Sequence, residues 1–307
     1  MSRILVTGAA GFIGSKLATT MAVRNTVLGL THDKLATQND ASVYWWPLDG
    51  DVCDYGRMLE IIIDQEIEYI YHLAAKSIVR NCRCDPLGCL ATNVLGTANI
   101  LEAARQSDNI KGIMVAESDK AYGDGITPYR ENQMLCPGSI YEASKACVTH
   151  IASAYHKNYG VPVFTVRSAN VYGPGDANMS RLIPGSITRL LNDEPPRITD
   201  GAEQFTREFF FIDDFVATVM ALMEKKPWGH VFNVGSGDVR CIGETVDTIC
   251  DLMGKDRVAD KWAKPDGLME IKNQSLCLDK LNEWLPDREI TTLKEGLKET
   301  IKWWQQN

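Results

Sequence analysis

The sequence predicts an α/β fold, with a doubly wound parallel sheet followed by a smaller lobe toward the C-terminus. Strand-like and helix-like segments alternate through the first half of the 307 residues, an order typical of a parallel sheet with helices on both faces. A glycine-rich turn directly follows the first predicted strand. After residue 175 the alternation loosens, and Pro195-Pro196, Gly201 and Gly229 separate short segments.

The first half therefore divides into elements of ordinary length. Ile4 to Val6 is a short apolar run, which is typical of a buried parallel strand. The predicted strands lie at 3–7, 26–30, 43–46, 68–73, 110–116 and 161–167, and the predicted helices at 12–23, 55–65, within 87–106 and at 139–158. We place a domain boundary near residue 175, which gives a first domain of 1–175 and a lobe of 176–307.

The turn after the first strand has the spacing Gly-x-x-Gly-x-x-Gly at Gly8, Gly11 and Gly14. Gly8 allows a tight turn, Gly11 lets backbone N–H groups approach a pyrophosphate, and Gly14 permits close packing of helix on strand. The following helix begins at Phe12 and Ile13, and its N-terminus attracts phosphate groups. The turn predicts a dinucleotide site.

A second segment carries chemistry, because a hydroxyl, a carboxylate and an amine follow one another at Ser118, Asp119 and Lys120. Downstream, Tyr141 and Lys145 are four residues apart, so a helix would place them on one face. A phenol with a pKa near ~10 is a poor base at neutral pH. A nearby ammonium favours the phenolate and brings it into working range.

Composition narrows the class of protein. The chain is 45% hydrophobic and carries a net charge of −8, which argues against nucleic acid or an anionic membrane as a partner. No apolar run approaches the ~18 residues of a transmembrane helix. Nine cysteines without a signal-peptide pattern lead us to expect reduced thiols and a cytoplasmic location. Cys82, Cys84 and Cys89 have no second cluster or nearby histidine, so no metal is expected.

Several segments, in order along nearly the whole chain, resemble the extended short-chain dehydrogenase/reductase family in its NAD-dependent nucleotide-sugar epimerase/dehydratase branch. Besides the glycine turn and the Ser118 and Tyr141 segments, they are Asp51-Val52, His72 to Ala75, Asn93 to Thr97, Arg167 to Gly175, Arg207 to Phe209 and Leu293 to Leu297. The resemblance implies a Rossmann-like NAD(P)-binding domain and a substrate-binding lobe. It also implies that segments near 209–234 return to the large domain, and that the helices at 87–106 and 139–158 form a homodimer.

The resemblance implies NAD as the cofactor, without excluding NADP. Gly29 or Leu30 falls where relatives carry a ribose-binding acid, while His32 and Lys34 suit a 2′-phosphate and Asp33 is a displaced ribose ligand. The implied cofactor residues are Gly8, Gly11, Phe12, Ile13, Gly14, Thr31, His32, Asp51, Val52, Leu73, Ala74, Ala75, Lys76, Asn93, Tyr141 and Lys145.

The resemblance also implies roles for the catalytic residues Ser118, Asp119, Lys120, Tyr141 and Lys145. Ser118 would hydrogen-bond the substrate oxygen that is oxidised, Tyr141 would remove its proton, and Lys145 would hold the nicotinamide ribose. Ser-Asp-Lys is most similar to the CDP-glucose 4,6-dehydratases, with Asp119 as the acid and Lys120 at the position of the base. The implied substrate-binding residues are Ser118, Asn170, Arg181, Leu182 and Arg207, the last for the diphosphate.

Three functions follow in order of preference. The first is a nucleotide-diphosphate-hexose 4,6-dehydratase. The second is a 4-epimerase or another epimerase, which shares the same triad, and the third is a catalytically idle nucleotide-sugar-binding regulator. The nucleotide base stays open, because Ile271-Lys272-Asn273 departs from the His-Glu-Ala of the dehydratase subgroup.

Overall fold

The computed structural model of the chain describes residues 1–32, 45–262 and 270–307. Asp33 and Lys34, which the sequence offers as ribose or phosphate ligands, lie outside the described residues. So do the first two residues of the strand predicted at 43–46.

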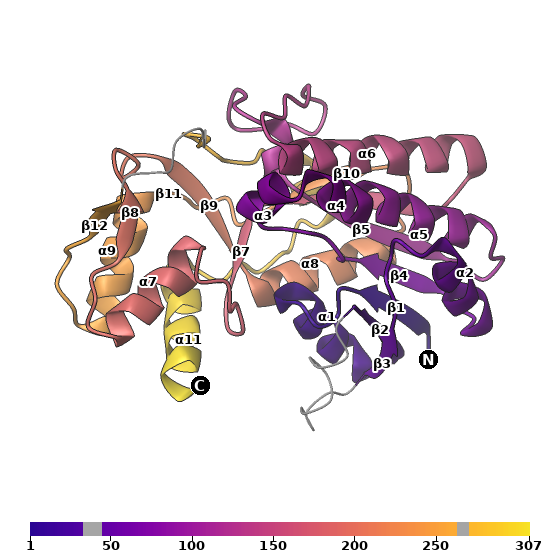
Figure 1. Cartoon of the computed structure of the whole chain (residues 1–307), viewed down its shortest axis with the longest axis horizontal. Coiled ribbons are helices and arrows are strands. Elements are labelled where there is room, and N and C mark those ends of the chain that lie inside the picture. The colour runs from indigo at the N-terminus through magenta and orange to yellow at the C-terminus, as the bar shows by residue number, and fades with distance from the viewer. Residues whose placement is uncertain (33–44, 263–269) are drawn as a thin grey trace.

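A seven-stranded sheet forms the centre of the larger part of the molecule, in the order β10-β6-β5-β4-β1-β2-β3, with every pair parallel (Figure 1). The strands are β1 (Arg3–Thr7), β2 (Thr26–Thr31), β3 (Trp46–Asp49), β4 (Tyr69–His72), β5 (Gly112–Ser118), β6 (Val163–Ser168) and β10 (Val231–Val234). The order turns back at β1, which has β2 on one side and β4 on the other. The predicted doubly wound parallel sheet is confirmed.

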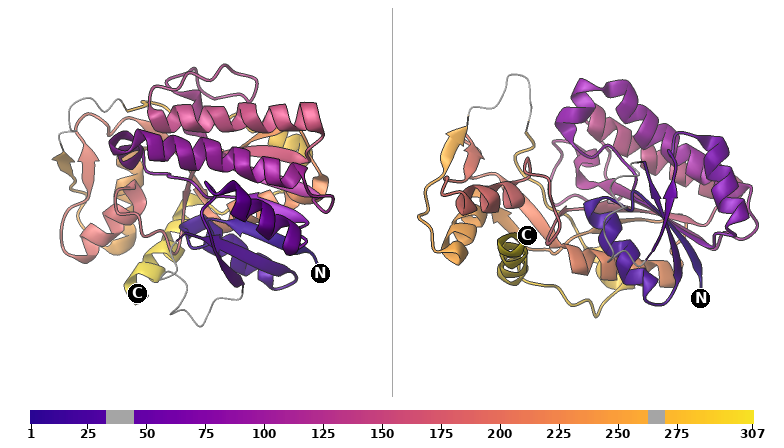
Figure 2. Two further views of the ribbon diagram at one scale, coloured as in Figure 1. Left: turned by 45° about the vertical axis from the view of Figure 1, so that its right-hand side comes forward. Right: turned by 60° about the horizontal axis from the view of Figure 1, so that its bottom comes forward.

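Helices cover both faces of this sheet (Figures 1 and 2). One layer packs α6 against α5 and α5 against α2, while the other packs α8 against α1. Their bounds are α1 (Phe12–Ala22), α2 (Tyr55–Asp64), α5 (Gly96–Arg105), α6 (Ile140–Tyr159) and α8 (Ile212–Lys225). Because crossover connections place helices on both faces, the strands read as nearly continuous apolar runs.

Helix α6 begins and ends at clear local signals. Ser139 and Glu142 form a capping box, in which each side chain accepts a hydrogen bond from the backbone of the other. Gly160 ends the helix in the left-handed conformation, with φ 72°. The cap sets the register, so Tyr141 lies in the first turn and Lys145 one turn later.

The helix predicted within 87–106 contains a break in its regular hydrogen bonding. It consists of α4 (Pro86–Leu90), the π-helical segment η2 (Ala91–Leu95) and α5, and the short α3 (Val79–Cys84) precedes it. The hydroxyl of Thr97 donates to the Asn93 carbonyl at 2.6 Å. Such single π turns occur mostly at functional sites, and this one holds Asn93.

Within the described residues, the rest of the chain forms a three-stranded sheet, a two-stranded sheet and four helices, most of them at one side of the large sheet (Figure 2). These elements are β7 (Asn170–Tyr172), α7 (Leu182–Leu191), β8 (Arg197–Thr199), β9 (Thr206–Phe211), β11 (Val239–Cys241), α9 (Ile242–Met253), β12 (Asp260–Trp262), α10 (Asp279–Trp284) and α11 (Leu293–Gln306). Strand β10 joins the large sheet and helix α8 packs against it, whereas β9 pairs with β7 and β11. The division of the chain at residue 175 stays a prediction.

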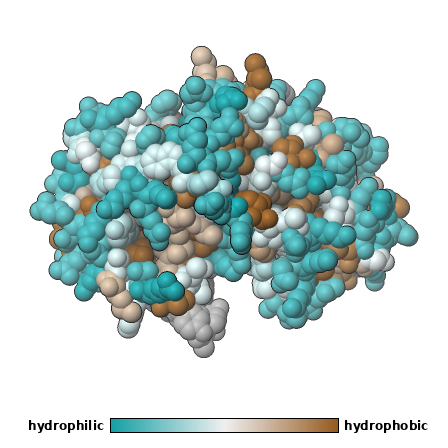
Figure 3. Space-filling view, turned by 180° about the vertical axis from the view of Figure 1, so that it is seen from behind, coloured by the Kyte–Doolittle hydropathy of each residue, from teal (hydrophilic) through white to brown (hydrophobic). Residues whose placement is uncertain are grey.

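The surface is mostly hydrophilic on the face seen in Figure 3, where hydrophobic side chains gather in small groups, mainly toward the middle. Within the described residues, no helix combines the length and apolarity that crossing a bilayer requires.

A buried ion pair lies near the carboxyl end of β5. Arg167 donates through Nε to Glu117 at 2.5 Å, and through its other nitrogens to Thr149 and Tyr122. The Arg167 guanidinium also stacks over the Tyr122 ring, 4.7 Å from its centre. The pair ties β6, β5 and α6 together one residue before Ser118.

Replacing Arg167 should therefore destabilise the fold strongly. Arg167→Met leaves the Glu117 carboxylate buried without its cation, which costs about 3–5 kcal/mol in the free energy of unfolding. Arg24→Met, at an exposed position, is the control and should change stability by less than about 0.5 kcal/mol. Urea unfolding at neutral pH measures both, and equal stabilities would contradict the importance of the pair.

Candidate functional site

The predicted site residues meet at one edge of the large sheet. Ser118 ends β5, and the segments beginning at Gly8 and Leu73 follow β1 and β4. Because these strands are parallel, their carboxyl ends lie at the same edge, on either side of the point where the strand order reverses. This is the position where open α/β sheets bind their ligands.

The glycine turn has the backbone that a dinucleotide phosphate needs. Gly8 has φ 71°, and a Cβ there would lie 2.9 Å from the Ala74 nitrogen. A Cβ at Gly14 would overlap the carbonyl oxygen of Gly8. Helix α1 begins after Gly11 with no side-chain cap and no acidic residue in its first turn, so the N–H groups of Phe12, Ile13 and Gly14 remain for an anion.

A chain of buried hydrogen bonds joins this turn to the neighbouring strands. The Thr7 hydroxyl accepts from the N–H groups of Leu73 and Ala74, both at 3.1 Å, so its hydrogen can be donated to His72 Nδ1 at 2.8 Å. His72 Nε2 then donates to the Thr97 hydroxyl at 3.0 Å. We assign this tautomer by counting donors. Burial lowers the pKa of His72 to about 3, so the imidazole is neutral.

Asn93 extends the chain to the catalytic helix. Its carboxamide accepts from the Lys76 N–H at 2.8 Å and donates both to the Lys76 carbonyl and to the Ser144 hydroxyl. Asn93 is itself buried. The structure therefore places this predicted cofactor residue behind Ala75 and Lys76, where it fixes their backbone. The Lys76 ammonium forms an ion pair with Asp85.

The residues predicted at the adenosine end lie after β2 and β3. Thr31 is buried at the end of β2, and its carbonyl accepts from the Gly50 N–H at 3.1 Å. Exposed His32 approaches Asp51, with Nδ1 3.9 Å from Oδ2. Val52 is buried, and its carbonyl accepts from Asn99 at 2.9 Å. The predicted residues Thr31, His32, Asp51 and Val52 thus lie at the carboxyl ends of β2 and β3, beside the glycine turn.

Ser118, Tyr141 and Lys145 meet where β5 and the start of α6 come together. Burial raises the pKa of Tyr141, while a hydrogen bond with Ser118 and the charge of Arg181 act in the opposite direction. Lys145 donates to the Ala116 carbonyl at 2.9 Å. Burial lowers the pKa of Lys145 to about 8, against the favourable charge of Glu117. The Tyr141 phenol is therefore protonated at neutral pH in this arrangement, and its activation depends on the cations around it.

Asp119 and Lys120 occupy a short 3₁₀ turn, η3 (Asp119–Tyr122), directly after Ser118. The Asp119 carboxylate is 2% exposed, and it accepts from Ser118 Oγ at 3.1 Å and from Gln274 Nε2 at 3.3 Å. Burial raises the pKa of Asp119, and Lys120 and Ser118 partly offset it. Desolvation lowers the pKa of Lys120, although its side chain keeps some exposure.

The predicted substrate residues approach this centre from other elements. Arg207 on β9 donates to the carbonyls of Thr206 and Lys272 and forms an ion pair with Glu270 at 2.9 Å. Its charge acts on both Asp119 and Lys120, so the structure places it beside the catalytic turn. Its contact with a diphosphate stays a prediction.

The other substrate residues surround the same edge. Arg181 precedes α7, forms an ion pair with Asp176 at 3.0 Å, and lies over the ring of Phe12 at 5.9 Å. Arg181 thus lies beside the glycine turn, and its positive charge acts to lower the pKa of Tyr141. Leu182 is the first residue of α7, and the Asn170 side chain donates to the Glu208 carbonyl at 3.3 Å.

Sequence reasoning missed Gln274 and Glu208. Gln274 is fully buried against Asp119, and Glu208 accepts from the N–H groups of Leu276 and Gly237, which fixes the segment that carries Gln274. Glu208 lay inside the Arg207 to Phe209 motif, which drew attention to the arginine. Nothing near Gln274 in the sequence indicated that it would meet a residue 155 positions away.

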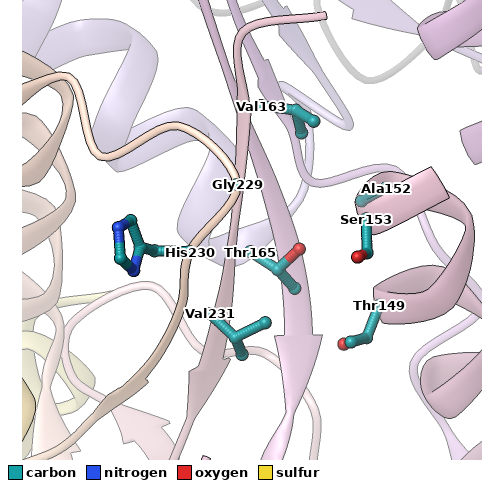
Figure 4. A pocket seen from close by; sticks show the side chains of 8 residues that line it. All are labelled: Thr149, Ala152, Ser153, Val163, Thr165, Gly229, His230 and Val231. Atoms are coloured by element: carbon teal, nitrogen blue, oxygen red, sulfur yellow. The ribbon is translucent and has the colours of Figure 1, made fainter. Parts of the chain in front are cut away.

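A separate cavity of about 10 Å³ lies away from this edge (Figure 4). It is lined by Thr149, Ala152, Ser153, Val163, Thr165, Gly229, His230 and Val231. Thr165 lies three residues before the end of β6, and the volume suits about one water molecule. None of the predicted site residues lines it. No three His, Cys, Asp or Glu side chains within 1–32, 45–262 and 270–307 come together as metal ligands.

Comparison with known proteins agrees with this geometry. The model of the NAD dependent epimerase/dehydratase family matches residues 4–235. The chain is 30% identical over 319 residues to a trifunctional UDP-glucose 4,6-dehydratase/UDP-4-keto-6-deoxy-D-glucose 3,5-epimerase/UDP-4-keto-L-rhamnose-reductase of Arabidopsis thaliana, over 99% of this chain and 47% of that protein. It thus spans about half the length of this plant relative.

Two further similarities extend over nearly complete proteins. The chain is 27% identical over 340 residues to dTDP-glucose 4,6-dehydratase 1 of Escherichia coli (strain K12), over 99% of this chain and 93% of that protein. The crystal structure of UDP-glucuronic acid 4-epimerase from Bacillus cereus, in complex with UDP-glucuronic acid and NAD, matches with a TM-score of 0.89 at 26% identity, over 99% of each chain. Dehydratases and epimerases are thus both among the similar proteins.

The glycine turn generates a binding prediction. Gly14→Ala forces a Cβ against the Gly8 carbonyl, so α1 must move and its N-terminal N–H groups leave their positions. We expect the affinity for NAD, measured by calorimetry, to fall by about tenfold or more. Gly56→Ala is the control, because its Cβ meets only a side-chain oxygen at 3.5 Å. Unchanged NAD affinity in folded Gly14→Ala would contradict the assignment of the turn.

Proposed function

Because the chain belongs to the NAD-dependent epimerase/dehydratase family, we propose that it is a nucleotide-diphosphate-hexose 4,6-dehydratase with NAD as its cofactor. One observation carries the proposal. A buried carboxyl group, Asp119, directly follows Ser118 and has a raised pKa. Dehydration needs an acid at the C6 hydroxyl, whereas inversion at C4 does not.

NAD, when bound, would supply the hydride acceptor for C4 of the hexose and the hydride donor for C6. The glycine turn and the backbone of Ala75 and Lys76, which Asn93 fixes from behind, would hold the cofactor at the carboxyl ends of the strands. Ser118 binds the C4 oxygen, and Tyr141 accepts its proton. Arg181 supplies positive charge near Tyr141 and so favours its phenolate. Lys145, which donates to the Ala116 carbonyl, would hold the nicotinamide ribose.

The elimination step falls to Asp119 and Lys120. The ketone at C4 acidifies the C5 proton, Lys120 removes that proton, and Asp119 protonates the departing C6 hydroxyl. Desolvation favours the neutral form of both groups, because it raises the pKa of Asp119 and lowers that of Lys120. A neutral acid beside a neutral amine is the pair that elimination requires.

A 4-epimerase is the second candidate, favoured by the structural similarity to the Bacillus cereus epimerase. It would use Ser118, Tyr141 and Lys145 in the same way, but Asp119 would have no departing hydroxyl to protonate. An idle regulator would show neither cofactor binding nor turnover. The CDP-linked substrate, the homodimer and the cytoplasmic location stay predictions. Leu87 and Leu95, both exposed on the α4 to η2 segment, suit the expected dimer contact.

The variant Asp119→Asn distinguishes a dehydratase from an epimerase. The variant cannot protonate the C6 hydroxyl, but it retains the residues that oxidise C4. Reduced nicotinamide absorbing near 340 nm should accumulate after CDP-, UDP-, GDP- or dTDP-glucose is added, while 4-keto-6-deoxy product falls by about 10²-fold or more.

Tyr141→Phe is the matched control for this experiment, because it should bind NAD but produce neither reduced nicotinamide nor the 4-keto-6-deoxy sugar. A wild-type product of unchanged mass with inverted C4 would reject the dehydratase proposal in favour of the epimerase.

Arg207→Ala tests the proposed diphosphate contact. Substrate binding should weaken by about 1.5–3 kcal/mol, the range for hydrogen bonds to charged groups, with NAD affinity unchanged. Arg240→Ala is the control, since Arg240 lies opposite Arg207 on β11 and is half exposed. Calorimetric titration with the nucleotide sugar that the wild type converts measures the affinity of both variants. Equal affinities would show that Arg207 contacts Glu270 and Lys272 but not the substrate.

A further inference from the structure

Gln274 makes a contact that the catalytic scheme so far does not use. Its side chain is fully buried, and Nε2 donates to Asp119 Oδ2 at 3.3 Å. Among the described residues, no group donates a hydrogen bond to its Oε1. Buried acceptors nearly always have a donor. This oxygen therefore needs a donor that the described part of the chain does not supply.

The backbone around Gln274 is fixed on both sides. Its own N–H donates to the Thr206 carbonyl at 3.1 Å, and the Leu276 N–H donates to Glu208 Oε2 at 2.9 Å. The Ser275 carbonyl accepts from the Tyr129 N–H at 2.8 Å. The carboxamide is thus presented to Asp119 by a segment tied to β9 and to the loop before α6, as a positioned group should be.

We propose that Gln274 holds the Asp119 carboxyl group in place and accepts a hydrogen bond from the C6 hydroxyl of the hexose. The inference rests on the proposed dehydration. Ser118 also donates to Oδ1 of Asp119 at 3.1 Å in this structure. Because a hydroxyl has one hydrogen, Gln274 is the donor that still holds the carboxyl group once Ser118 binds the C4 oxygen. The carboxamide then contacts, through its two ends, the acid and the group that the acid expels.

The step balances as follows. The C5 proton passes to Lys120, and the electron pair of the broken C5–H bond forms the C5–C6 double bond, which is conjugated with the C4 ketone. The C6–O bond breaks, and the oxygen leaves as water with its own hydrogen and the proton of Asp119. Asp119 becomes a carboxylate, which the N–H of Gln274 stabilises. The hydrogen bond from the hydroxyl to Oε1 orients the leaving oxygen toward Asp119.

Several charged or titratable groups act on Asp119 from the surrounding elements, and the test leaves them unchanged. They are Lys120 on the same turn, Arg207 and Glu208 on β9, Tyr141 on α6 and Tyr129 on the preceding loop. Gln274 is uncharged, so its replacement by methionine alters only the hydrogen bonds and keeps the size of the side chain.

The first test needs no substrate. Aspartate labelled with ¹³C at the side-chain carboxyl carbon is titrated by NMR in the wild type, in Gln274→Met and in Gln106→Met, with Asp119→Asn to assign the signal. Loss of a donor to the carboxylate should raise the pKa of Asp119 by about one unit in Gln274→Met. The exposed Gln106 is the control and should cause no shift. An unshifted Asp119 in folded Gln274→Met would overturn the positioning role.

The second test uses whichever of CDP-, UDP-, GDP- or dTDP-glucose the wild type dehydrates. Gln274→Met should slow water loss by about 10²-fold and form reduced nicotinamide at the wild-type rate. The wild type should bind the corresponding 6-deoxy nucleotide about tenfold more weakly than the substrate, whereas Gln274→Met, in which the C6 hydroxyl keeps only its contact with Asp119, should show a smaller preference. An equal preference in both enzymes would overturn the contact with Oε1.

The two tests separate the two proposals. If the wild type dehydrates none of the four nucleotides, the dehydratase proposal and the contact with the C6 hydroxyl fail together. The NMR titration still decides whether Gln274 controls the protonation of Asp119. If the wild type dehydrates one of them and Gln274→Met matches it in every measurement, only the inference about Gln274 fails.

Discussion

The arrangement of the site depends on the hydrogen bonds of the neutral His72 imidazole. The imidazole accepts a hydrogen bond from the Thr7 hydroxyl and donates one to Thr97. The Thr7 hydroxyl in turn accepts hydrogen bonds from backbone N–H groups of the segment after β4. Thr97 donates to Asn93, whose carboxamide holds Lys76 and Ser144. The glycine turn, the Ala75 segment and helix α6 are therefore positioned relative to one another by a single chain of hydrogen bonds. A protonated His72 would have no acceptor at Nδ1, and burial prevents that charge.

The π turn and the polar network coincide at Asn93. The Gly96 N–H bonds the Ala91 carbonyl, five residues back, instead of the carbonyl four residues back. The Thr97 hydroxyl donates to the Asn93 carbonyl at 2.6 Å, a bond that threonine also makes in regular helices. Within this turn the Asn93 side chain bonds both the N–H and the carbonyl of Lys76, so the loop that carries Lys76 is held by two hydrogen bonds.

Sequence patterns predicted the sheet and its glycine turn, because apolar strands and glycine spacing are local signals, and the family resemblance supplied the other residues that gather at the carboxyl ends of the strands. The position of β3 was less accurate. The prediction began at residue 43, whereas the strand runs from Trp46 to Asp49 with Pro47 inside it. Proline is tolerated there because β3 is an edge strand. Gln274 and the Glu270 partner of Arg207 were not predictable, since both contacts join residues more than 60 positions apart.

The Asp119 and Lys120 pair can exist as two ions or as two neutral groups, and both states have the same net charge. Desolvation penalises both ions, while their mutual attraction favours them. Arg207 favours an ionised Asp119 but disfavours an ionised Lys120, so its two effects partly cancel. Burial shifts the balance toward the neutral pair, which is the pair that the proposed elimination uses. In the proposed elimination, Lys120 would become an ammonium beside the developing enolate and would stabilise it. A carboxylate in that position would become a neutral carboxylic acid when it accepts the proton, so it would supply no positive charge to the enolate.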